Sequence, residues 1–63
     1  MIVDVATGFV TIRDAESILG IVNDLTVTPN QARMVAQNLL NEGTHTVAAE
    51  GLMRAADQAE KER

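Results

Sequence analysis

The chain contains no cysteine, no tryptophan and no tyrosine, and it has only one phenylalanine, one proline and one histidine. Without cysteine, neither a disulfide nor a thiolate zinc site can stabilise the fold, and a single histidine is too few for the usual zinc ligand sets. A chain of 63 residues buries only about 60% of the surface that its unfolded form exposes. Oligomerisation is the remaining common route to stability, so we expect a homodimer or a higher homo-oligomer.

Positive charge is also scarce, because five Lys and Arg residues face nine Asp and Glu residues and give a net charge of −4. The cations are scattered and no aromatic platform accompanies them, which disfavours broad binding to nucleic acid or anionic lipid. No apolar run reaches membrane-spanning length, and the N-terminal Met-Ile-Val-Asp lacks the positive region of a signal peptide. We therefore expect no membrane partner, and the lack of cysteine is in keeping with a cytoplasmic location.

The apolar periodicity predicts a mainly α protein: a single small helical domain (1–63) with three amphipathic helices. Residues 2–11 are rich in β-forming side chains around a Thr7-Gly8 turn signal, which predicts a short extended segment or hairpin. The first helix is predicted over residues 12–25. There, six apolar residues recur at spacings of three and four: Ile12, Ala15, Ile18, Leu19, Val22 and Leu25.

The second helix is predicted over residues 29–42 and has the clearest boundary signals. Thr28 is the expected N-cap, Pro29 occupies the first turn where its missing N–H costs nothing, and Gln31 completes a capping box. Gly43 is placed for the left-handed position that ends a helix. These four residues fix the helix from local chemistry alone.

A third helix is predicted over residues 47–61, with Thr44 or Thr46 as its cap. Its apolar face is narrow and consists mainly of small residues, which allow helix axes to approach closely. That face is formed by Ala48, Ala49, Leu52, Ala55, Ala56 and Ala59.

No residue pattern in the chain is typical of catalysis or of a bound cofactor. His45 is the only candidate base of ordinary pKa, and it lies in the break between two predicted helices without a predictable partner. Asp14 and Glu16 stand two apart on a predicted helix, so their carboxylates diverge. Neither a glycine-rich phosphate loop nor a calcium-loop spacing is present. We therefore expect no enzyme, no cofactor and no metal.

Residues 24–60 combine a short alternating segment that ends at Pro29, a helix, a break at Gly43 and a second helix. This order resembles a ribbon-helix-helix module, in particular the DNA-binding part of ParD-type antitoxins. The resemblance implies a dimer whose paired strands enter the major groove, with Thr26 and Thr28 facing bases and the backbone N–H groups after Thr46 meeting phosphate. The same segment also fits an inter-helix linker that ends in an N-cap, and the preceding helix and negative charge favour the linker.

The three predicted apolar faces together exceed what one small core can hide, which indicates contact with a second chain. Candidate surface residues for an oligomer or a partner are Met34, Met53, Leu52, Ala56 and Ile21. The leading hypothesis is a non-enzymatic, homo-oligomeric regulator or adaptor that binds another protein, of a size and acidity typical of phage and mobile-element proteins. The alternative is a dimeric ribbon-helix-helix transcriptional regulator. A third class is a ligand-binding oligomer with a site between subunits around His45 and Arg33.

Overall fold

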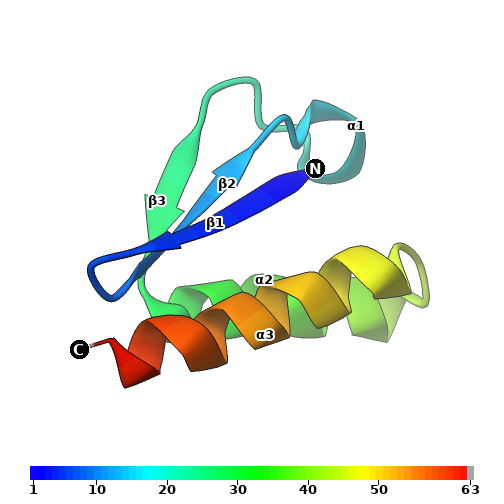
Figure 1. Cartoon of the computed structure of the whole chain (residues 1–63). Coiled ribbons are helices and arrows are strands. Elements are labelled where there is room, and N and C mark those ends of the chain that lie inside the picture. Colours follow the sequence, from blue (N-terminus) through cyan, green and yellow to red (C-terminus); the bar gives the residue numbers. More distant parts are fainter. Residues whose placement is uncertain (63) are drawn as a thin grey trace.

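The computed structural model describes residues 1–62 and shows an α+β protein in which a three-stranded antiparallel sheet is backed on one face by two helices (Figure 1). The expected mainly α architecture with three amphipathic helices is therefore wrong. The elements follow in the order β1 (Ile2–Ala6), β2 (Phe9–Arg13), α1 (Glu16–Leu19), β3 (Leu25–Val27), α2 (Pro29–Glu42) and α3 (Thr46–Lys61).

Strands β1 and β2 form a hairpin, which is one of the two predicted alternatives for the N-terminal segment. Thr7 and Gly8 form its two-residue turn with φ values of 51° and 81°, which is the positive-φ geometry that matches the twist of the flanking strands. The register places Ile2 opposite Arg13 and Ala6 opposite Phe9. The hairpin is longer than predicted and takes up the start of the segment that was expected to be helical.

Residues 12–25 do not form a helix. Ile12 lies in β2, only Glu16–Leu19 are helical, and the chain leaves this single turn at Gly20 with φ 70°. It becomes extended again at Leu25, which pairs with Ile12 across β2 and β3. The apolar residues spaced by three and four positions therefore lie in a strand, a helical turn, a second strand and the connections between them. The β-branched side chains among them have only a weak helical preference, and pairing in the sheet outweighs it.

Strand β3 also settles the conformation of the segment before α2. Leu25–Val27 pair antiparallel with β2 of the same chain, so the linker interpretation of residues 24–28 is wrong for these three positions. Thr11 lies in the middle of β2. Its hydroxyl is hydrogen-bonded to that of Thr26, with 3.2 Å between the two oxygens.

Helix α2 has the boundaries that its sequence predicts, and the capping box is confirmed. The Gln31 backbone N–H donates to Thr28 Oγ1 at 3.2 Å, and the Thr28 N–H donates to Gln31 Oε1 at 3.0 Å. At the other end Gly43 has φ 72°. The N–H groups of Gly43 and Thr44 donate to the carbonyls of Leu40 and Leu39, which is a Schellman ending.

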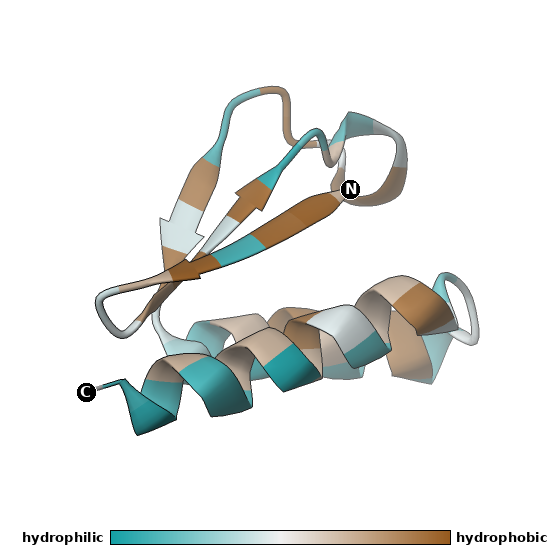
Figure 2. Ribbon diagram, in the orientation of Figure 1, coloured by the Kyte–Doolittle hydropathy of each residue, from teal (hydrophilic) through white to brown (hydrophobic). Residues whose placement is uncertain are grey.

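Helix α3 runs close to its predicted range but begins differently. Its N-cap is His45 with φ 52°, and that residue makes no capping side-chain hydrogen bond within the described chain. Thr46 is already the first helical residue, so the expected threonine cap is wrong. The C-terminal end of α3 is hydrophilic (Figure 2). Lys61 lies in its last turn, where a cation is favourable beside the helix carbonyls.

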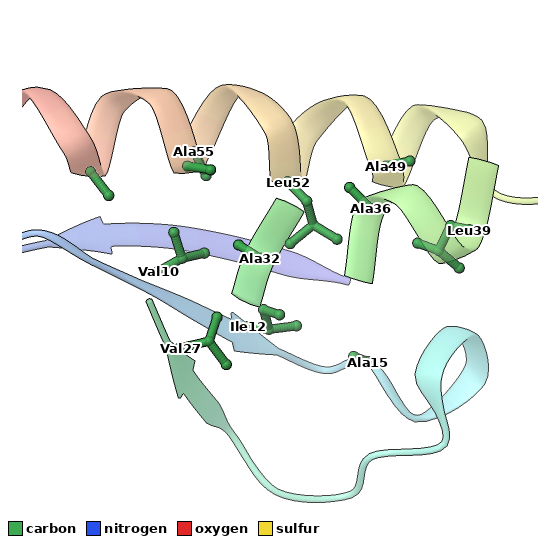
Figure 3. Close-up of a cluster of buried hydrophobic side chains, with 12 residues drawn as sticks. Val10, Ile12, Ala15, Val27, Ala32, Ala36, Leu39, Ala49, Leu52 and Ala55 are labelled. Atoms are coloured by element: carbon green, nitrogen blue, oxygen red, sulfur yellow. The ribbon is translucent and has the colours of Figure 1, made fainter. Parts of the chain in front are cut away.

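The core lies between the sheet and the helical hairpin (Figure 3). Its largest fully buried side chains are Val10 and Ile12 from β2 and Leu52 from α3. Seven of the twelve buried residues in this hydrophobic cluster are alanines, so α2 and α3 contribute mostly methyl groups. These are Ala15, which precedes α1, and Ala32, Ala36, Ala49, Ala55, Ala56 and Ala59 of α2 and α3. Leu40 of α2 lies outside this core, and its side chain is 38% exposed. This is a thin core for an independent domain.

Candidate binding surfaces

Helices α2 and α3 cover only one face of the sheet (Figure 1). Successive strand residues point to opposite faces, and burial alternates accordingly along β1 and β2. The opposite face carries Ile2, Asp4, Ala6, Phe9, Thr11, Arg13 and Thr26. We refer to these seven residues as the uncovered sheet face.

Phe9 is the most distinctive residue of the uncovered sheet face. It is the only aromatic residue of the chain, and it is 46% exposed. Its cross-strand neighbour on β1 is Ala6, which is too small to shield the ring. Ile2, at the other end of β1, is 52% exposed. Exposed aromatic and aliphatic side chains on one face are typical anchors of a protein interface.

Arg13 is the only cation of the three strands, and it lies between two carboxylates. Arg13 Nη2 is 3.3 Å from Asp4 Oδ2, and Arg13 Nε is 3.9 Å from Asp24 Oδ2. All three side chains are about half exposed or more, so these pairs contribute little to stability. Their effect is on the surface potential, because the one positive charge of this face is neutralised.

The three threonines predicted to face DNA do not form one surface. Thr26 lies on the uncovered sheet face, where its hydroxyl contacts that of Thr11. The Thr28 hydroxyl already accepts the N–H of Gln31 in the cap of α2. Thr46 begins α3 at the opposite end of the helical hairpin from Thr28 (Figure 1).

The five residues predicted to line an oligomer or partner surface are also separated. Leu52 and Ala56 have no exposure and belong to the core. Met53 is partly buried against that core, whereas Met34 is 67% exposed on α2. Ile21 lines a pocket. The sheet, which the periodicity did not reveal, covers the helix face that was expected to bind a second chain.

Arg33 and His45 do not form a common site either. Arg33 donates to Glu60 and, at 2.9 Å, to Asp57 Oδ1. These hydrogen bonds, the one to Glu60 first, raise the pKa of Arg33 above its ordinary value, so this cation is occupied in joining α2 to α3. His45 lies at the start of α3, about 18 Å along the helix axis from Asp57.

A pocket that the sequence did not reveal lies between α1 and α2, with a volume of about 280 Å³. Its wall is formed by aliphatic residues, and two polar residues of α2 complete it, Asn38 and Glu42. The aliphatic residues are Ile18, Leu19, Ile21, Val35 and Leu39. One feature of the sequence could have indicated this pocket. Ile21 and Val22 are adjacent apolar residues that lie between the helix-breaking Gly20 and the polar Asn23, where a predominantly polar loop is expected.

Residues 1–62 contain no group of three or more His, Cys, Asp or Glu side chains arranged to hold a metal ion. No helix in this part of the chain is both long and apolar enough to span a bilayer. Comparison with protein families, with curated proteins and with solved structures gave no match to this chain.

Proposed function

We propose that this protein is a small, non-enzymatic, homo-oligomeric regulator or adaptor that binds another protein. The observation that carries the proposal is the one-sided covering of the sheet, which leaves Phe9 and Ile2 exposed on a face without helices. We assign the contact between copies to the uncovered sheet face. Two sheets packed through such faces would form a sandwich with the helices outside.

The composition of the core supports self-association. The largest fully buried side chains are Val10, Ile12 and Leu52, and a single core of this size supplies little net stability below about 70–80 residues. Phe9 is only 46% exposed in a single copy, so burying the rest of it between copies adds about half of the 1.5–3 kcal/mol that a fully exposed side chain would gain. Association therefore compensates for the alanine-rich core.

The size of the uncovered sheet face sets the expected affinity. Strands of five, five and three residues, with about 3.4 Å per residue and about 4.8 Å between strands, span roughly 210 Å² in plan. A standard interface buries about 800 Å² per partner. We therefore expect a weak, concentration-dependent association in the micromolar range rather than an obligate dimer.

Sedimentation equilibrium between about 1 and 100 μM tests the contact between copies. The wild-type mass is expected to rise above the monomer value of 6.8 kDa with concentration. Phe9→Ser is expected to return the mass to that of the monomer. Met34→Ser, which removes an even more exposed apolar side chain from α2, is not. A wild-type monomer throughout this range would contradict self-association, and equal effects of the two variants would contradict the assigned face.

The partner is tested by affinity capture from the host with mass spectrometry, using the wild-type chain as bait. The proposal expects a protein that is retained at stoichiometric amounts and that is lost when the bait is unfolded. Recovery of no specific protein under these conditions would count against the adaptor role.

A second candidate is a dimeric DNA-binding regulator of the ribbon-helix-helix type. It is favoured by one observation, the strand–helix–helix order of β3, α2 and α3 with Thr26 pointing outward. The one cation of the uncovered sheet face, Arg13, is paired with Asp4 and Asp24. Fluorescence anisotropy with a mixed-sequence duplex tests this candidate. It predicts binding at about 20 mM salt that weakens steeply as the salt concentration rises, and no binding at low salt would exclude it.

A further inference from the structure

The pocket between α1 and α2 combines an aliphatic wall with a carboxylate. We propose that this α1–α2 pocket receives a lysine or arginine side chain of the protein partner, with the methylene stem against the wall and the cation at Glu42. The inference rests on the proposed binding of a protein and adds the chemistry by which the partner is recognised.

The size and lining of the pocket suit one long side chain. Its volume of about 280 Å³ is at the lower limit of the roughly 300–1,000 Å³ that small-molecule and cofactor sites occupy. Ile18 and Leu19 on one side and Val35 on the other offer apolar surface to a stem. Lysine and arginine bury such stems along apolar surface while the charged end stays at the rim.

The polar side of the pocket attracts a cation. Glu42 is the last residue of α2, where the helix carbonyls already carry a partial negative charge. The last turn of α2 contains no basic residue, whereas α3 has Lys61 at the corresponding position. The negative end of α2 therefore lacks the compensation that α3 has.

Neither polar residue of the pocket is engaged by its own chain. Within residues 1–62, the side chains of Asn38 and Glu42 take part in no hydrogen bond and no ion pair. The side-chain amide oxygen of Asn38 and the carboxylate of Glu42 are both available as acceptors. Arg13 and Arg33 are paired elsewhere in the fold, so a cation from outside the chain fits the site better than either of these.

The loop beside the pocket gives a second indication of an external contact. Val22 follows the pocket residue Ile21 and is 76% exposed. The rest of the loop is polar or glycine: Gly20, Asn23 and Asp24. An exposed aliphatic residue next to a pocket with an apolar wall extends the surface on which a partner segment can rest.

Four isoleucines make the pocket accessible to a specific measurement. Selective labelling of isoleucine δ1 methyl groups gives four NMR signals: Ile18 and Ile21 from the pocket, Ile12 from the core and Ile2 from the uncovered sheet face. Titration with n-pentylammonium, a mimic of the lysine side chain, is expected to shift the signals of Ile18 and Ile21 and to leave the other two unchanged. The isosteric probes n-pentanol and pentanoate separate apolar filling from charge recognition.

The matched variants are Glu42→Gln and Glu50→Gln, which each remove one exposed carboxylate from a helix. Glu42→Gln is expected to weaken pentylammonium binding roughly two- to fivefold, as for an exposed ion pair, and Glu50→Gln is expected to change nothing. The proposal is overturned if Ile18 and Ile21 do not shift, if pentanol or pentanoate binds as tightly as pentylammonium, or if both variants weaken binding equally.

The same variants connect the pocket to the partner. Capture from the host with the Glu42→Gln chain is expected to recover less of the specific protein than capture with Glu50→Gln. If the partner is retained equally by both variants, the pocket assignment fails while the adaptor role stands. If pentylammonium binds as expected but no specific protein is captured, the adaptor role fails and the cation site stands.

Discussion

Two glycines provide a test that separates the observed fold from the helix that the periodicity predicts. Gly20 ends α1 with φ 70°, whereas Gly51 lies inside α3 in ordinary helical conformation. A Cβ atom built at either position meets no atom within 4 Å, so alanine substitution changes only the backbone energetics. If residues 12–25 were helical, both substitutions would stabilise the protein.

The expected effects have opposite signs. Alanine at Gly20 costs about 1–2 kcal/mol in the left-handed region, and about 0.4–1 kcal/mol is regained because the unfolded chain becomes less flexible. Gly20→Ala is therefore expected to destabilise the protein by about 1 kcal/mol. Gly51→Ala is expected to stabilise it by about 1 kcal/mol through helix propensity.

Urea unfolding followed by circular dichroism at 222 nm measures both changes. With a slope of about 1 kcal/mol/M for a small domain, the urea midpoints of the two variants should differ by roughly 2 M. In thermal unfolding, the melting temperature should fall by about 4–8 °C for Gly20→Ala and rise by about 4–8 °C for Gly51→Ala. Stabilisation by Gly20→Ala comparable to that by Gly51→Ala would refute the turn at Gly20 and restore the helical interpretation of residues 12–25.

Three further predictions, with five substitutions, test the core, the caps and the end of α2. Leu52→Ala is expected to lower the free energy of unfolding by about 2.7–5 kcal/mol, which is enough to unfold a domain of this size. Leu40→Ala, at a 38% exposed position, should lower it by about 1 kcal/mol or less. Urea titration compares the two variants, and equal losses would contradict the burial of Leu52. Thr28→Ala should lower the free energy of unfolding by about 1 kcal/mol because it removes the N-cap, whereas Thr46→Ala should change it by less than about 0.5 kcal/mol; a larger loss at Thr46 would show that this residue caps α3 after all. Glu42→Gln should stabilise the protein by about 0.3–1 kcal/mol and raise its melting temperature, because it removes a negative charge from the negative end of α2. A melting temperature below that of the wild type in calorimetry would argue against an uncompensated helix end.

The parts of the fold that the sequence predicts are those governed by local chemistry. The Thr28–Gln31 capping box, the left-handed Gly43 and the Thr7-Gly8 turn each depend on residues within a few positions of one another. Their backbone groups must be satisfied locally whatever the rest of the chain does. These positions consequently give the boundaries of α2 and the tip of the hairpin.

The parts that could not be predicted depend on partners distant in the sequence. Ile12 and Leu25 stand thirteen positions apart, and their pairing across β2 and β3 leaves no trace in a helical periodicity. Because the sheet was missing from the prediction, Leu52 and Ala56 were predicted to contact a second chain, although they are buried under the sheet. The pocket of Glu42 was hidden for the same reason, since it requires α1 to return over α2.

The contact of α3 with β1 joins the last helix of the chain to its first strand. The β1–β2 hairpin and the α2–α3 hairpin each consist of neighbours in the sequence and can form within microseconds, but an isolated hairpin is marginal in water. Neither half retains a core by itself, because Val10 and Ile12 come from one and Leu52 from the other. Folding is therefore expected to be a single cooperative event limited by the docking of the two halves, and removal of either β1 or α3 should abolish the whole structure rather than a part of it.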